Sequence, residues 1–424
     1  VVVIDESSMI NNSMFKDLEI ISTKIPGKII FVGDRNQLPP VNQTLSNVFT
    51  TDKYQNIQLI KIMRATGNNK IIDLSNYIRT SITEQNNLKL KQFKDDHVFI
   101  HRKQLNWLNC YIEKIVNFSK NDKSVILAYT NNRCNVINSV VRSILFTPEQ
   151  LSQKYVPGEH IIFNNFYQTK NNKYYTSQNE IIKEVSIEKF KIEKLDLSEI
   201  INLKNKLNPL SKKTENDDVL VEPCQICNED EVDDLCVTVC EHKLCIECIK
   251  QWINKNKCCP LCLTEVSDEK IIVKDCDRIN YFIDELTDLL ISLEFEVYNI
   301  KLLNGDYINT LTDNSKKRYE EVEKRIKAIM TNIKNEIFSN KKIMNFGLVI
   351  LSRLWLFIFN NIVDVFAEIN YGYCITSHKS QGSTYTNVFV DISNILNFNR
   401  DPTDGMKCLY TSVTRASDTL HLFY

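Results

Sequence analysis

The sequence predicts an α/β protein built on a parallel sheet, with a small antiparallel β-rich segment and a cysteine-rich segment inserted into it. Short apolar runs recur along the chain, mostly followed by stretches with helical spacing; these runs are VVVIDE, KIIFVGD, SVILAY, TNVFVDI and TLHLFY. This alternation is typical of parallel sheets covered by helices. Between about residues 155 and 313 the pattern instead alternates as in antiparallel strands, and nine of the 14 cysteines lie between Cys224 and Cys262.

Length and composition are those of an ordinary globular protein. With 424 residues the chain is long enough for two or three domains. A hydrophobic share of 43% and a charged share of 25% argue against wholesale disorder and against a membrane protein. The net charge of -1 gives no general basic field, so any contact with nucleic acid requires a local groove of Lys, Arg and aromatic side chains.

The cysteine distribution bears on the compartment. Because the cysteines cluster and no signal-peptide pattern opens the chain, we expect a metal site in a reducing, intracellular compartment. The scattered cysteines are expected to be buried, reduced thiols; they are Cys110, Cys134, Cys276, Cys374 and Cys408. Residues 343–363 are apolar, but Arg353 divides them into runs too short for a bilayer span. We therefore expect a buried helix there and no membrane partner.

The chain starts directly with an apolar strand. VVVIDE is not preceded by a methionine, and a run of this kind belongs inside a parallel sheet rather than at an exposed terminus. We therefore expect this strand to be buried and the chain to be a fragment of a longer protein.

Two carboxylates follow this first strand, at the sheet edge where open α/β folds bind ligands. Asp5 can hold the shell of a magnesium ion, and Glu6 can orient and deprotonate water that attacks a γ-phosphate. An acidic turn without a catalytic role is the alternative. The next strand favours catalysis because it ends in Gly33 and Asp34, with Gln37 close behind and a rigid Pro-Pro pair after it. Gln37 could then sense the γ-phosphate from a fixed turn.

The cysteine cluster has the spacing of structural zinc sites. It reads CQIC, CEHKLCIEC and CPLC, which supplies enough ligands for two closed tetrahedral sites. The predicted ligands of the two zinc ions are Cys224, Cys227, Cys240, His242, Cys245, Cys248, Cys259 and Cys262. Cys236 and Cys258 are left over, because Cys259 alone fits the CPLC spacing.

Six further segments occur in a characteristic order: VVVIDESSM, GDRNQLPPV, LIKIMRAT, AYTNNRCNVIN, ITSHKSQGSTY and LYTSVTRAS. In that order they resemble motif II (the Walker B strand), motif III, motif IV, the start of the second RecA-like domain, motif V and motif VI of superfamily 1 helicases. The resemblance is to the RecD/Dda-like branch with a UvrD-like C-terminal domain, and it covers nearly all of the chain outside the cysteine cluster. It implies a RecA-like P-loop NTPase fold and an ATP-driven DNA helicase.

The resemblance also implies roles at the matching positions. Asp5, Glu6 and Gln37 are expected to act on ATP with Mg²⁺, while Arg64 and Arg415 reach the γ-phosphate as arginine fingers. Further nucleotide contacts are expected at Gly33, Asp34 and Gly382. Contacts with DNA phosphates are expected at Thr376, His378, Lys379, Ser380 and Gln381, although His378 taken alone would be a structural histidine.

One segment resembles a known insert, and one motif is missing. PGEHIIFNN and YYTSQNE resemble the SH3-like barrel that this branch inserts into its second RecA-like domain, where it helps to hold or split the duplex. The aromatic side chains there are either base-stacking groups or barrel core; they are Phe163, Phe166, Tyr174 and Tyr175. The P-loop expected before VVVIDE is absent from the sequence, so we expect this segment alone to bind ATP poorly or not at all. We favour the interpretation that the sequence is a truncated helicase over the interpretation that the protein has lost its motor function.

The order of seven cysteines with a histidine in fourth place resembles a RING finger. The resemblance implies a cross-brace, with Cys224, Cys227, Cys245 and Cys248 on one ion and Cys240, His242, Cys259 and Cys262 on the other. It also implies contact with a ubiquitin-conjugating enzyme through Ile226, Trp252 and Pro260, for which a role in a tiny core is the alternative. Leu263 stands where active ligases often have a basic residue, which argues against ligase activity and not against zinc.

These assignments predict a domain order and a function. Residues 1–55 are expected to be a remnant of the first RecA-like domain, 56–154 and 315–424 the second, and 155–314 the barrel insert, interrupted by a linker at 187–221 and the RING finger at 222–266. We expect a motor that acts on single-stranded or forked DNA. The alternative is a zinc-dependent interaction or ubiquitin-ligase protein on a degenerate helicase scaffold. The Asn-, Ile- and Lys-rich composition suits an AT-rich genome. A helicase fused to a RING finger suits a large DNA virus, and thus the cytoplasm or nucleus of an infected host cell.

Overall fold

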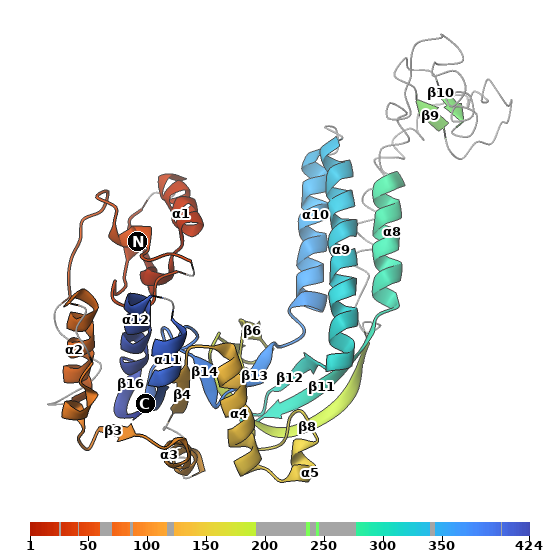
Figure 1. Cartoon of the computed structure of the whole chain (residues 1–424). Coiled ribbons are helices and arrows are strands. Elements are labelled where there is room, and N and C mark those ends of the chain that lie inside the picture. The colour runs from red at the N-terminus through yellow and green to blue at the C-terminus, as the bar shows by residue number, and fades with distance from the viewer. Residues whose placement is uncertain are drawn as a thin grey trace. The chain divides into compact units, whose positions relative to one another are not determined.

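The structure is a computed structural model, and it describes residues 1–24, 27–40, 42–59, 70–84, 88–116, 123–191, 235–237, 243–245, 277–339, 344–399 and 401–424. The chain divides into two compact units. Unit 1 comprises Val1–Val185, Ile300–Tyr307 and Glu368–Tyr424, and unit 2 comprises Ser186–Asn299 and Ile308–Ala367. Figure 1 labels many of their helices and strands.

A five-stranded parallel sheet forms the centre of unit 1. Its order is β14-β4-β15-β16-β3, and the strands are Cys374–Thr376, Ser124–Ala128, Tyr385–Asp391, Ala416–Phe423 and Val98–His101. All four pairings are parallel, which confirms the predicted α/β class. Every residue of β4 is buried, as is typical of a strand with helices on both faces of its sheet.

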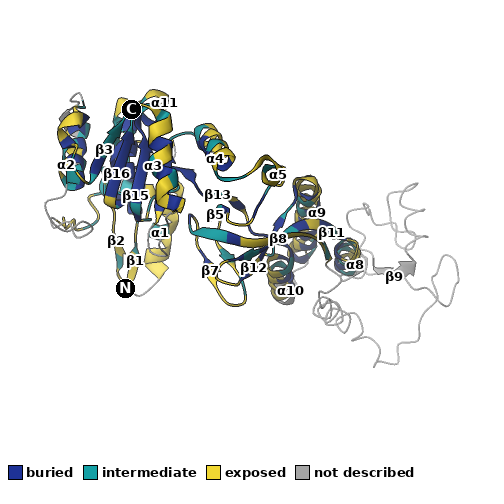
Figure 2. Ribbon diagram, turned by 90° about the horizontal axis from the view of Figure 1, so that it is seen from below, coloured by how far each residue is buried: buried dark blue, intermediate teal, exposed yellow. Residues whose placement is uncertain are grey.

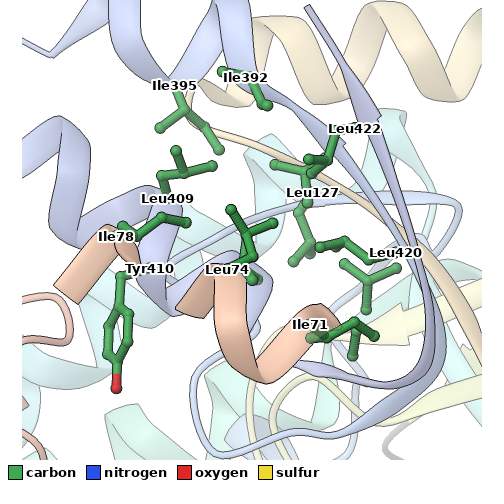
Figure 3. Close-up of a cluster of buried hydrophobic side chains, with 14 of the residues drawn as sticks. Ile71, Leu74, Ile78, Leu127, Ile392, Ile395, Leu409, Tyr410, Leu420 and Leu422 are labelled. Carbon is green, nitrogen blue, oxygen red and sulfur yellow. The ribbon is translucent and has the colours of Figure 1, made fainter. Parts of the chain in front are cut away.

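Helices cover this sheet on both sides. Beyond residue 59, the described helices of unit 1 are α2 (Lys70–Glu84), α3 (Gln104–Val116), α4 (Asn131–Leu145), α5 (Pro148–Leu151), α11 (Ile392–Phe398) and α12 (Pro402–Val413). A 3₁₀ turn, η3, lies at Leu90–Phe93. One apolar core joins α2 and α12 to the sheet through residues such as Leu74, Leu409 and Leu420 (Figure 3). A second core joins α3 and α4 to the other face, around Trp107 and Phe389. Figure 2 shows the buried strands between these layers.

Four of the scattered cysteines lie among the described residues. Cys134, Cys374 and Cys408 are buried and Cys110 is half-buried, and all four are free thiols. Burial raises the pKa of the Cys408 thiol to about 12. These observations confirm the reduced state that we expect of them, although Cys110 is less buried than expected. Cys276 lies outside the described residues.

The first segment of unit 1 is a small α/β element. Strands β1 (Val2–Ile4) and β2 (Ile29–Phe31) pair in parallel, with the helix α1 (Asn12–Lys24) between them in sequence and the 3₁₀ turns η1 (Ser7–Met9) and η2 (Asn47–Phe49). The expected burial of the first strand is wrong, because Val1 and Val3 are 84% and 61% exposed. In the described part of the chain, β1 pairs with β2 alone, and the local core contains just Ile10, Phe15 and Val48 as buried apolar residues.

The predicted antiparallel segment begins in unit 1. β5 (His160–Phe163) pairs antiparallel with β13 (Ile369–Tyr371) and with the first residues of β8 (Asn179–Lys191). Strands β6 (Tyr167–Gln168) and β7 (Lys173–Tyr174) form a hairpin. The antiparallel pattern is therefore confirmed. That this segment forms an SH3-like barrel stays a prediction.

Unit 2 contains three helices of 15 residues or more among the described residues: α8 (Asp277–Ile291), α9 (Asp313–Ser339) and α10 (Met344–Ile358), the last continuing into a π-helical turn at Phe359–Val363. Its strands are β9 (Leu235–Val237), β10 (Lys243–Cys245), most of β11 (Glu294–Leu302) and most of β12 (Tyr307–Leu311). Helix α9 is amphipathic and buries its periodic apolar face, including Ile326 and Ile333. None of the described helices combines the length and apolar character needed to cross a membrane.

A buried histidine lies in the central sheet of unit 1. The ring of His421, in β16, stacks on Phe389 with centroids 4.1 Å apart and on Phe99 with centroids 4.6 Å apart. Its Nδ1 lies 3.1 Å from Nε2 of His101. Burial, with smaller contributions from the charges of His101 and Lys114, lowers the pKa of His421 to about 3. The native protein therefore holds His421 neutral.

We predict that His421 makes the protein acid-labile. Its folded pKa of about 3 lies below the ordinary value of 6.5, so its contribution to stability is full above pH 6.5 and is lost as the pH falls from 6.5 towards 3. The expected loss attributable to His421 is about 2 kcal/mol between pH 6.5 and pH 5. Urea unfolding at a series of pH values should show a shallower pH dependence for His421→Phe than for the wild type.

Candidate nucleotide and nucleic-acid site

The turn after β1 holds Glu6 in an unusual backbone conformation. Its φ of 50° and ψ of 40° lie in the left-handed region, which non-glycine residues seldom occupy. The Asp5 carboxylate contributes to the turn, because its Oδ1 accepts a hydrogen bond of 2.8 Å from the Glu6 backbone N–H. Backbone conformations of this kind cost on the order of 1 kcal/mol and concentrate at functional sites. Here the conformation sets the direction of the Glu6 side chain.

The end of β2 lies directly against this turn. A Cβ at Gly33 would be 2.5 Å from Ser7 Oγ, so only glycine allows the two strand ends to approach this closely. Just beyond it, Asp34 Oδ1 accepts from the Asn36 backbone N–H at 2.9 Å, and its Oδ2 accepts from the Tyr410 hydroxyl at 2.7 Å. Burial, together with the Asp34 charge and hydrogen bond, raises the pKa of Tyr410 well above its usual range. Asp34 therefore fixes the turn and joins it to α12.

Gln37 bridges a carboxylate and a guanidinium. In the amide orientation that satisfies both groups, its nitrogen donates to Glu6 Oε2 at 3.3 Å and its oxygen accepts from Arg415 Nη2 at 3.2 Å. Arg415 is fully buried; its Nε also donates to the Thr411 carbonyl at 3.1 Å. Gly382, with a φ of +76°, lies beside Glu6, where an added Cβ would be 3.8 Å from the Glu6 carboxylate. The structure thus brings together residues from both ends of the sequence.

The turn that carries Gln37 is held by two further hydrogen bonds. The backbone N–H of Leu38 donates to Thr411 Oγ1 at 3.1 Å, and the Leu38 carbonyl accepts from Gln381 Nε2 at 3.5 Å. Leu38 itself is buried in the core that contains α2 and α12. A displacement of Gln37 would therefore change the contacts of this turn with the motif V segment and with α12.

The motif V segment follows β14 as a tight, hydrogen-bonded loop. Ser377 accepts from the Ser412 hydroxyl at 2.7 Å, and its carbonyl accepts from the Ser380 hydroxyl at 2.7 Å. Thr376 and Ser380 are buried, whereas His378, Lys379 and Gln381 are half-buried. Burial lowers the pKa of His378, against the opposing effect of Asp404. Among the predicted DNA contacts, the side chains of His378, Lys379 and Gln381 are therefore more exposed to solvent than those of the other two residues.

Lys379 is held by the antiparallel strands of unit 1. Its Nζ donates to Asn164 Oδ1 at 2.8 Å, just after β5. The Ser177 hydroxyl, between β7 and β8, donates to the Lys379 carbonyl. Neither Asn164 nor Ser177 carries a sequence signal that predicts this contact. Tyr410 was also missed, although it stands inside the motif VI segment, because the sequence does not tell which helix face meets Asp34.

Several predicted site residues lie outside the described residues. Arg64 is one of them, as are Ile226, Trp252 and Pro260. The same is true of the predicted zinc ligands, apart from the backbone of Cys245 in β10; the others are Cys224, Cys227, Cys240, His242, Cys248, Cys259 and Cys262. In the part of the chain that the structure does describe, no group of three His, Cys, Asp or Glu side chains could hold a metal ion.

Three family models match the sequence. A UvrD-like helicase C-terminal domain matches residues 371–423, which contain the motif V loop and Arg415. An AAA domain matches residues 1–104, which contain Glu6 and Gln37. A C3HC4-type zinc finger, or RING finger, matches residues 224–262.

Individual proteins are similar over the whole chain or over the cysteine cluster. An uncharacterized protein of Acanthamoeba polyphaga mimivirus is 28% identical over 445 residues, covering 99% of this chain and 73% of the relative. E3 ubiquitin-protein ligase RNFT1 of Xenopus tropicalis is 44% identical over 52 residues, 12% of each chain. Among solved structures, the Bacteroides Pif1 helicase in complex with ADP-AlF3 and ssDNA is 12% identical with a TM-score of 0.39, covering 100% of this chain and 70% of its own. The Candida albicans Pif1 helicase is 13% identical with a TM-score of 0.33, covering 99% and 72%.

Proposed function

We propose that this chain, an ATP-dependent DNA helicase that carries a RING finger, hydrolyses ATP at a centre built from Glu6, Gln37 and Arg415. The observation that carries the proposal is the bridge from the Glu6 carboxylate through the Gln37 amide to the buried Arg415 guanidinium. A carboxylate and a guanidinium held this close through a neutral amide supply a base and a cation side by side. Attack of water on a γ-phosphate requires both.

Each residue of this centre has a chemical task. Asp5 is exposed at the end of β1, and its carboxylate fits the shell of a magnesium ion bound to ATP. Glu6 orients the attacking water and accepts its proton. Arg415 neutralises charge on the phosphate oxygens, and Arg64 is proposed as a second finger. Bound Mg²⁺-ATP supplies the electrophilic phosphorus, and its triphosphate needs a P-loop besides these residues.

The same contacts offer a route from ATP to the DNA strand. Gln37 touches the two catalytic side chains, and the next residue, Leu38, is hydrogen-bonded to Thr411 and Gln381. A change at the γ-phosphate would move Gln37 and thereby the motif V loop. We propose that this loop contacts the phosphates of single-stranded or forked DNA through Thr376, His378, Lys379, Ser380 and Gln381, with Lys379 as the main charge.

The domain assignment follows from this proposal. We propose residues 1–55 as part of a first RecA-like domain, 56–154 and 315–424 as a second one, and 155–314 as an SH3-like insert. The parallel sheet of unit 1 and the antiparallel strands around β5 support this division. An intracellular location, in a virus-infected cell, is consistent with the similar mimivirus protein.

The proposed base is tested by Glu6→Gln. We expect this variant, in protein that is joined to a P-loop domain, to bind ATP normally and to lose at least about 100-fold in DNA-stimulated turnover. The reason is that the amide cannot accept the proton from water, while Asp5 can still contribute to binding the magnesium ion. Nucleotide binding and steady-state phosphate release are the measurements. Glu19→Gln on α1, where Glu19 accepts from Lys53, is the control and should turn over normally. Normal turnover by Glu6→Gln would remove Glu6 from the mechanism.

The RING segment is proposed to hold two zinc ions in the cross-brace. One site is Cys224, Cys227, Cys245 and Cys248, and the other is Cys240, His242, Cys259 and Cys262. Thiolate and imidazole donors in this number suit structural zinc. Such zinc contributes folding free energy directly, which a segment this small needs.

The ligand assignment is tested by counting zinc. We expect two zinc ions per chain by elemental analysis and a loss of at least one in Cys245→Ser. Because the two sites interlock along the sequence, the remaining ion should also be easier to remove with a chelator. Cys236→Ser is the matched control, since Cys236 is not a proposed ligand. A wild-type content of one ion, or equal losses from the two variants, contradicts the assignment.

A second candidate function is ubiquitin transfer by the RING segment. The likeness to E3 ubiquitin-protein ligase RNFT1 over 52 residues favours it, and Leu263 argues against it. We propose Ile226, Trp252 and Pro260 as the contact for a ubiquitin-conjugating enzyme. Autoubiquitination with a panel of such enzymes should be seen in the wild type and should fall at least about tenfold in Ile226→Ala, which leaves the zinc ligands intact. Activity with none of the enzymes would leave the RING segment as a docking module.

A further inference from the structure

Four aromatic side chains of the antiparallel segment divide into two pairs of opposite exposure. Phe163 and Tyr174 are buried, at 1% exposure each, and their rings stack with centroids 4.6 Å apart. Phe166 and Tyr175 are 55% and 60% exposed, with ring centroids 5.8 Å apart. The first pair is core. The second pair, here called the aromatic platform, presents two rings to solvent next to each other.

We propose that the aromatic platform binds single-stranded nucleic acid by stacking on its bases beside Lys379. This inference rests on the proposed function and names the surface by which the strand is held. Every base has an apolar π-face, and exposed aromatic rings next to a cation are the groups that bind unpaired bases without regard to sequence. A duplex keeps those faces inside its own stack.

Hydrogen bonds to one buried carboxylate hold the hairpin between the two residues of the platform in place. The Asp306 carboxylate accepts from the hydroxyl of Thr169 at 2.7 Å, from Asn172 Nδ2 at 2.9 Å and from the hydroxyl of Tyr174 at 2.7 Å. These bonds pin the β6–β7 hairpin that joins the two aromatic residues. Two rings held in place lose little conformational entropy when a base stacks on them, and this favours binding.

The predicted phosphate contact, Lys379, is held by residues that lie close in sequence to both rings of the platform. Phe166 follows Asn164 by two residues, and Asn164 accepts the hydrogen bond from Lys379 Nζ. Tyr175 precedes Ser177 by two residues, and Ser177 donates to the Lys379 carbonyl. Ser177 has a φ of 68°, so the chain turns sharply between the ring and this contact. The ammonium of Lys379 is therefore anchored by the same two chain segments that carry the rings.

Charge around the platform favours a polyanion. The segment from 164 to 177 contains two lysines, Lys170 and Lys173, and no acidic residue, and both lysines are exposed. Two acidic groups contact this segment: Glu368, which accepts from Asn165 Nδ2 at 2.8 Å, and Asp306, which is buried beneath the hairpin. Rings for the bases and ammonium groups for the phosphates thus occur on one short stretch of chain.

The test compares variants that keep or remove the aromatic faces. The probe is fluorescein-labelled oligothymidine, with binding followed by anisotropy at several salt concentrations. The double variant Phe166→Leu, Tyr175→Leu keeps apolar volume but loses both rings, and we expect its affinity to fall about tenfold or more. The matched control Phe166→Tyr, Tyr175→Phe keeps both rings and should bind as the wild type does. Thermal unfolding should be the same for both double variants, because the platform is exposed.

The salt dependence separates stacking from charge. The leucine variant should keep the wild-type slope of log affinity against log salt, whereas Lys379→Ala should lower its magnitude by about 0.7, the value for one phosphate contact on a single strand. Equal binding by the leucine variant and the wild type overturns the platform, and so does an equal loss in both double variants. Wild type that fails to bind the oligonucleotide also overturns it. The proposed ATPase is judged apart from this, by the turnover of Glu6→Gln.

Discussion

The burial of the Arg415 guanidinium is the constraint on which the candidate site depends. A buried charge without partners would cost several kcal/mol, so its donors must all find acceptors. Those acceptors include the Thr411 and Ser383 carbonyls, the Thr414 hydroxyl and the Gln37 amide, and the Gln37 amide also donates to Glu6. The hydrogen bonds to the Arg415 side chain thus fix the positions of the end of α12, the start of β15 and the turn after β2. The left-handed conformation at Glu6 is consistent with a turn whose geometry is set by this network.

The parallel sheet explains why residues so far apart in sequence meet. In a parallel sheet every strand ends at the same edge, and the crossover helices return the chain to the opposite one. β14 and β4 therefore place the motif V loop beside the segment that follows Ala128, where the Ser377 backbone N–H donates to the Ala128 carbonyl. The short pair of β1 and β2 brings Glu6 and Gly33 to one edge by the same rule.

The antiparallel strands of unit 1 have a second role besides their own core. Asn164 and Ser177 hold Lys379, so the conformation of the proposed DNA contact depends on a segment that lies some 200 positions away in sequence. The buried pair of Arg142 and Glu159 fixes this segment to α4, with two hydrogen bonds of 2.6 and 3.0 Å between them. Removing either partner would leave an uncompensated buried charge. The proposed DNA contact and the proposed nucleotide centre are therefore connected through packed, hydrogen-bonded elements within unit 1.

The sequence by itself determined the α/β class, the strands β4, β15 and β16 and the zinc-type spacing of the cysteines, because these depend on local periodicity and on ligand spacing. It also indicated Glu6, Gln37 and Arg415, through motifs whose order is visible without a structure. Tertiary structure alone decided that these three side chains touch, that Tyr410 binds Asp34, and that Val1 and Val3 are exposed rather than buried. It also decided which aromatic rings are core and which face solvent, since Phe163 and Phe166 have the same chemistry but Phe163 is buried at the end of β5 whereas Phe166 is exposed in the connection between β5 and β6. Contacts between distant positions and the burial of individual side chains arise from packing, which sequence periodicity does not encode residue by residue.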